Sequence, residues 1–186
     1  MWFGVFGGRP YVVCPPRLSF SGEVFESVSG FTNTGSTVMT DIKAWPRGVI
    51  LWRAVPHWLG GLGILVLFVA LLSSLGVGSK ALFLNESTAR SGAGGLQERI
   101  QDLAARLWQI YVGLSAICCL GLIGLGMSPF ESVCHTMSAI STGGFSPRNE
   151  SIAAYGSAAI ELWIVLFMVL GGVSFVLYAW LLQGRW

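Results

Sequence analysis

The chain has 186 residues, of which 53% are hydrophobic and only 11% are charged. Soluble domains carry about 25% charged residues, so this composition excludes a water-soluble domain and indicates an integral membrane protein. The net charge of +2 is small and dispersed, and it does not support a function in nucleic-acid binding.

Residues 1–21 form a short segment that is interrupted by glycine and proline. It cannot supply an uninterrupted membrane span of about 20 residues, and it lacks the ordered regions and cleavage site of a signal peptide. We therefore expect an atypical or truncated N-terminal segment, either because the chain begins part-way through a larger membrane protein or because its start is unusual.

Residues 22–75 are predicted to form a first repeat. A short helix over 23–33 is followed by a Thr/Ser-rich loop, a polar turn over 41–48 and a long apolar helix over 49–75. Arg53 lies near the start of this long helix, where a charged side chain usually extends to the membrane interface. Lining of an outer vestibule by Arg53 and His57 is the alternative.

Residues 76–102 form the one extended hydrophilic stretch, and we expect a linker there. Residues 103–186 are predicted to form a second repeat, with a span over 107–127, a short helix over 128–140, a loop over 141–145 and a last span over 158–182. His135 is expected to make a hydrogen bond in the core. The four cysteines show no metal-ligand or redox spacing, and we expect small buried hydrophobic residues at Cys14, Cys118, Cys119 and Cys134.

The two loops carry the feature that indicates a function. Thr34-Gly35 and Thr142-Gly143 lie 108 residues apart, although the shared FESV motif falls three residues off that register. Backbone carbonyls can replace the hydration shell of a monovalent cation if the chain is extended toward a common axis. Glycine permits such a backbone. Thr-Gly is also a common turn element, so the prediction of two selectivity-filter loops depends on their placement between a short helix and a long one.

The segment FESVSGFTNTGSTVMTDIKAWPRGVILWRAVPHWLGGLGILVL closely resembles part of the TrkH/KtrB/HKT superfamily of potassium transporters. LWQIYVGL and MSPFESVCHTMSAISTGGFSPRNESIAAY resemble the next repeat of that family. The resemblance covers about residues 20–182. It implies an all-α integral membrane fold of helix–pore loop–helix repeats, here with about three transmembrane helices and two re-entrant pore helices, in a chain that represents part of a four-repeat protein.

The resemblance also implies the site and the partners. The potassium ion is expected at Thr34, Gly35, Thr142 and Gly143, and the family places the loops at the outer face, which puts residues 76–102 in the cytoplasm. A homodimer in the inner (plasma) membrane, gated by a cytoplasmic nucleotide-binding subunit of the TrkA/KtrA type, is implied as well. The matching filter residues are Thr32, Asn33, Thr34, Gly35, Ser141, Thr142 and Gly143.

The sequence differs from the family pattern at Asn33, where threonine is more usual, and in the absence of the first outer helix and of repeats three and four. Four loops are needed to surround the ion, so two loops form half a ring. We expect potassium uptake as part of a TrkH-like transporter, with no cofactor and no enzymatic activity. The alternatives are a sodium or mixed-cation transporter of the same family, from which Gly35 points away, and a non-conducting scaffold or inactive fragment.

Overall fold

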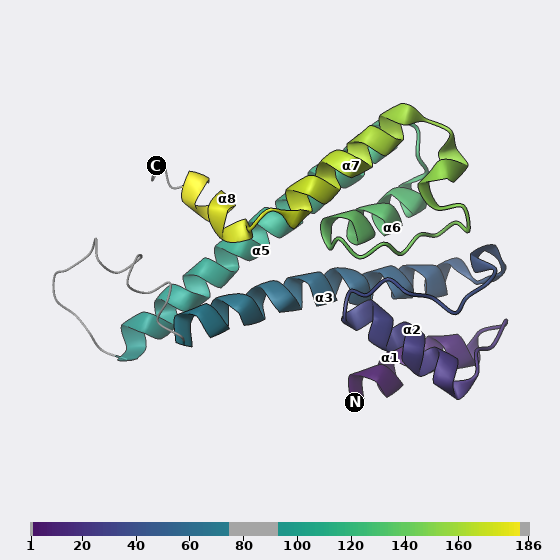
Figure 1. The fold of residues 1–186 in the computed structure, drawn as a ribbon, viewed down its shortest axis with the longest axis horizontal. Coiled ribbons are helices and arrows are strands. Elements are labelled where there is room, and N and C mark those ends of the chain that lie inside the picture. The colour runs from purple at the N-terminus through teal and green to yellow at the C-terminus, as the bar shows by residue number, and fades with distance from the viewer. Residues whose placement is uncertain (1, 75–92, 183–186) are drawn as a thin grey trace. The chain divides into compact units, whose positions relative to one another are not determined.

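The computed structural model describes residues 2–74 and 93–182, and every regular element in those ranges is a helix, which confirms the all-α prediction (Figure 1). The chain divides into two compact units, residues 1–61 with 113–173 and residues 62–112 with 174–186. The helices are α1 (Trp2–Val13), α2 (Phe20–Phe31), η1 (Ile42–Ala44), α3 (Arg47–Ser74), α5 (Ala93–Gly124), α6 (Pro129–Ile140), η2 (Ser151–Tyr155), α7 (Ala158–Gly172) and α8 (Phe175–Leu182).

The N-terminal segment is helical for 12 residues and lies against α2 (Figure 1). Glycines permit this close packing, because a Cβ on Gly8 would lie 3.2 Å from the Glu23 carbonyl oxygen and one on Gly7 would overlap Ser27. Since 12 residues rise only about 18 Å, α1 is too short to cross a bilayer. The sequence excluded a full span here but did not predict this helix.

The two short helices α2 and α6 have the same length and the same type of N-terminal cap. Ser19 accepts a hydrogen bond from the backbone of Gly22, and Ser128 accepts one from the backbone of Glu131. Serine at this position satisfies an N–H group that the helix itself leaves unpaired. Both helices have 12 residues, about 18 Å of rise, as the prediction of two helices shorter than the membrane required.

The predicted lead-in and the second span form one continuous helix, α5, of 32 residues. Within it, residues Ala104–Gly124 have a mean hydropathy of 1.8 and are long and apolar enough to cross a membrane, the one such helix among the residues described. α3 begins two residues before the predicted start. The predicted linker lies outside the described residues from 75 to 92, and its last residues belong to α5.

The predicted last span over 158–182 is divided into α7 and α8, and the prediction of one continuous helix is wrong. Val173 leaves the helical conformation with ψ 143°, and α8 begins two residues later. The break follows Gly171-Gly172, where the sequence indicated a kink or a close neighbour. A Cβ on Gly171 would lie against the carbonyl oxygen of Ile140, the last residue of α6, so close packing at this glycine is confirmed.

A buried cluster lies beside the first loop and joins α1, η1, α3 and α6 within the first unit. Tyr11 meets Trp45 edge to face, with ring centroids 6.3 Å apart. The indole of Trp52 donates to the Gly7 carbonyl oxygen at 2.8 Å. The cluster consists of Tyr11, Met39, Ile42, Trp45, Val49, Ile50, Ala54 and Cys134.

Candidate functional site

The first loop begins where α2 ends. Thr32 caps the helix, and the backbone N–H of Thr34 donates to the Ser29 carbonyl oxygen at 3.0 Å. Asn33 and Gly35 both adopt left-handed backbone conformations, with φ of 60° and 75°. Asparagine and glycine are the residue types that tolerate such angles best, so the local sequence explains this winding of the chain.

The second loop repeats this backbone pattern at the end of α6. Ser141 caps the helix, and the backbone N–H of Gly143 donates to the Ser138 carbonyl oxygen at 2.9 Å. Thr142 and Gly144 are the left-handed residues, with φ of 56° and 97°. The two loops therefore have the same hydrogen bonds and the same order of conformations.

The structural register of the repeat is 109 residues, and the 108-residue register given by the Thr-Gly pairs is wrong. Asn33 corresponds to Thr142, and Gly35 corresponds to Gly144. Gly143 takes the place of Thr34. The second left-handed residue of each loop is a glycine, and the Gly-Gly pair in the second loop concealed which of its two glycines meets that requirement.

The two loops are in direct contact. The side-chain amide of Asn33 donates from Nδ2 to the carbonyl oxygen of Ser141. A Cβ on Gly35 would overlap the carbonyl oxygen of Gly143 and would lie 3.1 Å from its carbonyl carbon. Gly35 is thus required twice, once by its positive φ and once by the neighbouring loop.

The structure distributes the predicted filter residues between an open and a packed side of the loops. Thr32, Thr34 and Thr142 are not buried, and the hydroxyls of Thr32 and Thr34 lie 2.7 Å apart. Ser141 is buried, and its carbonyl oxygen accepts hydrogen bonds from both Asn33 and the Thr142 hydroxyl, the latter at 2.7 Å. Because a carbonyl oxygen has two lone pairs, that of Ser141 is fully used within the protein.

A buried ion pair behind the loops holds their following segments. The Glu26 carboxylate on α2 accepts hydrogen bonds from the Val38 backbone at 2.7 Å, from the Thr37 hydroxyl and from Arg53 Nε at 3.2 Å. Arg53 in turn donates to the Ser146 carbonyl oxygen at 3.2 Å. Glu26 and Arg53 therefore connect one short helix, α3 and the chain after each loop.

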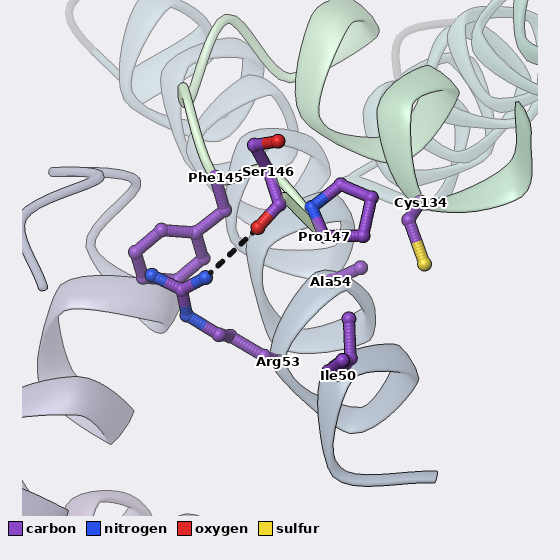
Figure 2. A pocket seen from close by; sticks show the side chains of 7 residues that line it. All are labelled: Ile50, Arg53, Ala54, Cys134, Phe145, Ser146 and Pro147. Carbon is purple, nitrogen blue, oxygen red and sulfur yellow. Dashed lines mark hydrogen bonds between the residues drawn. The ribbon is translucent and has the colours of Figure 1, made fainter. Parts of the chain in front are cut away.

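Arg53 is 2% exposed, so the expectation that it extends to the interface is wrong. Its guanidinium carbon lies 3.8 Å from the centroid of the Phe145 ring, a cation–π contact that favours arginine over lysine. Figure 2 shows the guanidinium beside Phe145 and the hydrogen bond to Ser146. These residues border a small cavity of about 10 Å³, the space of one water molecule, together with Ile50, Ala54, Cys134 and Pro147.

Polar contacts also join the two exit segments beyond the loops. Asn149 accepts from the Ile42 backbone at 2.7 Å and donates to the Asp41 carboxylate at 3.1 Å. Glu131 pairs with Arg148 at 2.7 Å. Partial burial raises the pKa of Glu131, but hydrogen bonds from Arg148 and Ser128 outweigh it and hold that pKa below its ordinary value. The carboxylate therefore stays ionised at neutral pH.

The two histidines are both buried. His57 is fully buried, so the alternative that it lines an outer vestibule is not supported. Its ring meets Phe145 edge to face at 4.3 Å between centroids. His135 meets Tyr155 at 5.6 Å, but its Nε2 has no hydrogen-bond partner among the described residues, so the expected core hydrogen bond is absent at that atom. Sequence reasoning missed Glu26 and Gly144, of which the Gly-Gly pair was the one visible signal.

Similarity to known proteins agrees with this geometry. The TrkH family, described as cation transport protein, matches residues 9–183. A Trk system potassium uptake protein TrkH from Halomonas elongata is 41% identical over 180 residues, which is 95% of this chain and 37% of that protein. TrkH from Escherichia coli is 36% identical over 183 residues, 98% of this chain and 38% of that protein. The crystal structure of the potassium transporter TrkH from Vibrio parahaemolyticus matches with a TM-score of 0.77 and 31% identity, covering 95% of this chain and 34% of that one.

The chain thus spans a little over a third of the length of these relatives. The match of the family covers nearly all of its residues, and the solved structure shares its fold as well as its sequence. The resemblance seen in the sequence is confirmed, and it indicates a membrane transport protein and not an enzyme. The chain belongs to the TrkH family of cation transport proteins.

Proposed function

We propose that this chain supplies two of the filter loops through which a potassium uptake protein passes its ion. The observation that carries the proposal is the pair of loops with equal backbone geometry, in contact with each other, each starting at the C-terminal end of a short helix. A helix C-terminus carries a partial negative charge, and two such ends beside one opening favour a cation there.

The proposed filter contains all seven residues expected from the sequence, with Gly144 added as the structural counterpart of Gly35. Thr32, Thr34 and Thr142 lie on the open side, while Asn33 and Ser141 hold the loops together. The potassium ion is expected at the exposed carbonyls of both loops. The chain replaces water around the ion, and the ion then moves down its electrochemical gradient.

In this proposal α2 and α6 are re-entrant pore helices, and α3, α5 and α7 with α8 are the membrane-crossing segments. The protein lies in the inner (plasma) membrane with residues 76–102 in the cytoplasm. Membership of the family favours a homodimer and a gating subunit of the TrkA/KtrA type as partners, and co-purification of such a subunit with the chain tests this part.

Uptake measurements test the proposal. The chain is expressed in cells that lack potassium uptake, both alone and in a chimera in which residues 9–183 replace the matching segment of Escherichia coli TrkH. We expect the chimera to restore uptake, Gly35→Ala and Gly144→Ala to abolish it, and Gly113→Ala to leave it unchanged, since a Cβ on Gly113 meets nothing within 4 Å.

Uptake that persists in both loop variants would contradict the filter and favour the scaffold alternative. The sodium alternative is separated by the same chimera, because a filter that prefers potassium restores growth at low potassium in the presence of excess sodium. Uptake by the chain alone would indicate that two copies complete a ring of four loops.

A further inference from the structure

Three polar atoms beside the loops are buried without a hydrogen-bond partner among the described residues. They are Oδ1 of Asn33 and both ring nitrogens of His57. His57 is 0% exposed, on the part of α3 that belongs to the first unit. A buried polar group that lacks a partner costs about 1–3 kcal/mol, so the arrangement calls for a specific explanation.

The unpaired atoms of the two side chains meet at one point, the space left by the missing side chain of Gly143. A Cβ built on Gly143 would overlap Nε2 and Cδ2 of His57 and would lie 2.6 Å from Oδ1 of Asn33. The Asn33 oxygen and the His57 Nε2 atom therefore face the same small volume. One can accept a hydrogen bond and the other can donate one.

Chemistry sets the direction of this pairing. The Ser141 carbonyl oxygen can only accept, so the Asn33 side chain must present its Nδ2 donor there. Its Oδ1 then points away from Ser141, toward the space shared with His57. An acceptor in that position requires an N–H group, which the Nε2-protonated imidazole supplies.

We propose that Asn33 and His57 form one positioning pair, in which the Nε2–H of His57 donates to Oδ1 of Asn33 while Asn33 Nδ2 holds the Ser141 carbonyl. The pair connects α3 through the first loop to the second. As far as it concerns ion selectivity, this inference rests on the proposed function, because it assigns the spacing of the two filter loops to these side chains.

Asn33 is suited to this role by its conformation and by its reach. It stands at the left-handed position that threonine occupies in the second loop. The hydroxyl of Thr142 bonds to the adjacent Ser141 carbonyl, whereas the amide of Asn33 reaches across to the other loop. Threonine at position 33 would retain a hydroxyl but would lose both long-range hydrogen bonds.

Nitrogen NMR of histidine tests the pair without any need for transport. The chain has two histidines, so ¹⁵N-histidine labelling of the purified chain, with His135→Gln to remove the second signal, isolates His57. We expect a neutral ring with its proton on Nε2, whose resonance moves in Asn33→Thr and stays in Ser36→Ala. A proton on Nδ1, or a resonance unaffected by Asn33→Thr, would overturn the pair.

Selectivity in the chimera tests its effect on the ion. The ratio of potassium to sodium uptake is measured for Asn33→Thr, His57→Met and the double variant. Each single change is expected to lower the ratio about fivefold, the factor that corresponds to about 1 kcal/mol for one hydrogen bond, and the double variant should fall no further. His57→Gln, which keeps a donor, should retain most of the selectivity.

Independent losses that multiply in the double variant would refute the coupling. Loss of selectivity in His57→Gln equal to that in His57→Met would show that ring volume matters and not the hydrogen bond. If the unaltered chimera carries no potassium, the proposed function fails, while the NMR result still decides whether Asn33 and His57 are paired.

Discussion

Removal of Arg53 should destabilise the chain strongly, because it strands a buried carboxylate. Glu26 and Arg53 have side-chain exposures of 0% and 3%, and their atoms lie 3.2 Å apart. In Arg53→Met, Glu26 keeps its hydrogen bonds from Val38 and Thr37 but has no counter-charge. Breaking one partner of a buried pair costs about 3–5 kcal/mol, a large part of the stability of any domain.

The double variant supplies the decisive comparison. Glu26→Gln keeps an oxygen for the Val38 backbone and removes the charge, so Glu26→Gln with Arg53→Met should recover about 2 kcal/mol or more of the loss, because replacing both charges of a buried pair is far less costly than breaking it. Arg53→Lys keeps the charge but loses the planar contact with Phe145, and should fall between the two.

The assay is unfolding of the detergent-solubilised chain, followed by tryptophan fluorescence across a denaturant series. Lys43→Met, on the exposed surface of η1, serves as the control for loss of a positive charge. A cost of less than about 1 kcal/mol for Arg53→Met, the level of a surface ion pair, would refute the assignment of Glu26 and Arg53 as the connection behind the loops. Equal costs for the single and double variants would do the same.

Two further predictions concern packing and pH. Gly121→Ala should lower thermal stability, because its Cβ would overlap the indole of Trp163, whereas Gly124→Ala, with nothing within 4 Å, should leave the melting temperature unchanged or slightly raised; equal melting temperatures would contradict the packing of α5 on α7. The Glu131 pKa is lowered in the folded chain, so its contact with Arg148 stabilises the fold above the unfolded pKa of about 4.3, and this contribution disappears as the pH falls through the folded pKa. Glu131→Gln should therefore lower the melting temperature at pH 7 but not at a pH below the folded value, and an equal decrease at both pH values would refute the linkage.

Much of the architecture follows from local chemistry and could be predicted from the sequence. The low charged fraction indicates membrane helices, and the spacing of apolar and polar segments predicts where the long and short helices lie. Ser19 and Ser128 precede helices too short to span, and Thr/Gly-rich loops follow both of them. These features depend on residues close together in the chain, which is why the amino-acid sequence alone suffices to predict the two loops and the family.

Other features depend on residues that lie far apart in the chain, and the tertiary structure alone decides them. The 109-residue register follows from which glycine of the Gly143-Gly144 pair adopts a positive φ, and both glycines can adopt it. An arginine near a helix start suits the interface as well as a buried pair, and the presence of Glu26 at 3.2 Å decides for the pair. The same holds for Asn33, whose residue type permits a turn, but whose contact with Ser141 exists because folding brings two loops side by side. The sequence by itself determined the elements and their chemistry, whereas packing determined which polar groups became partners.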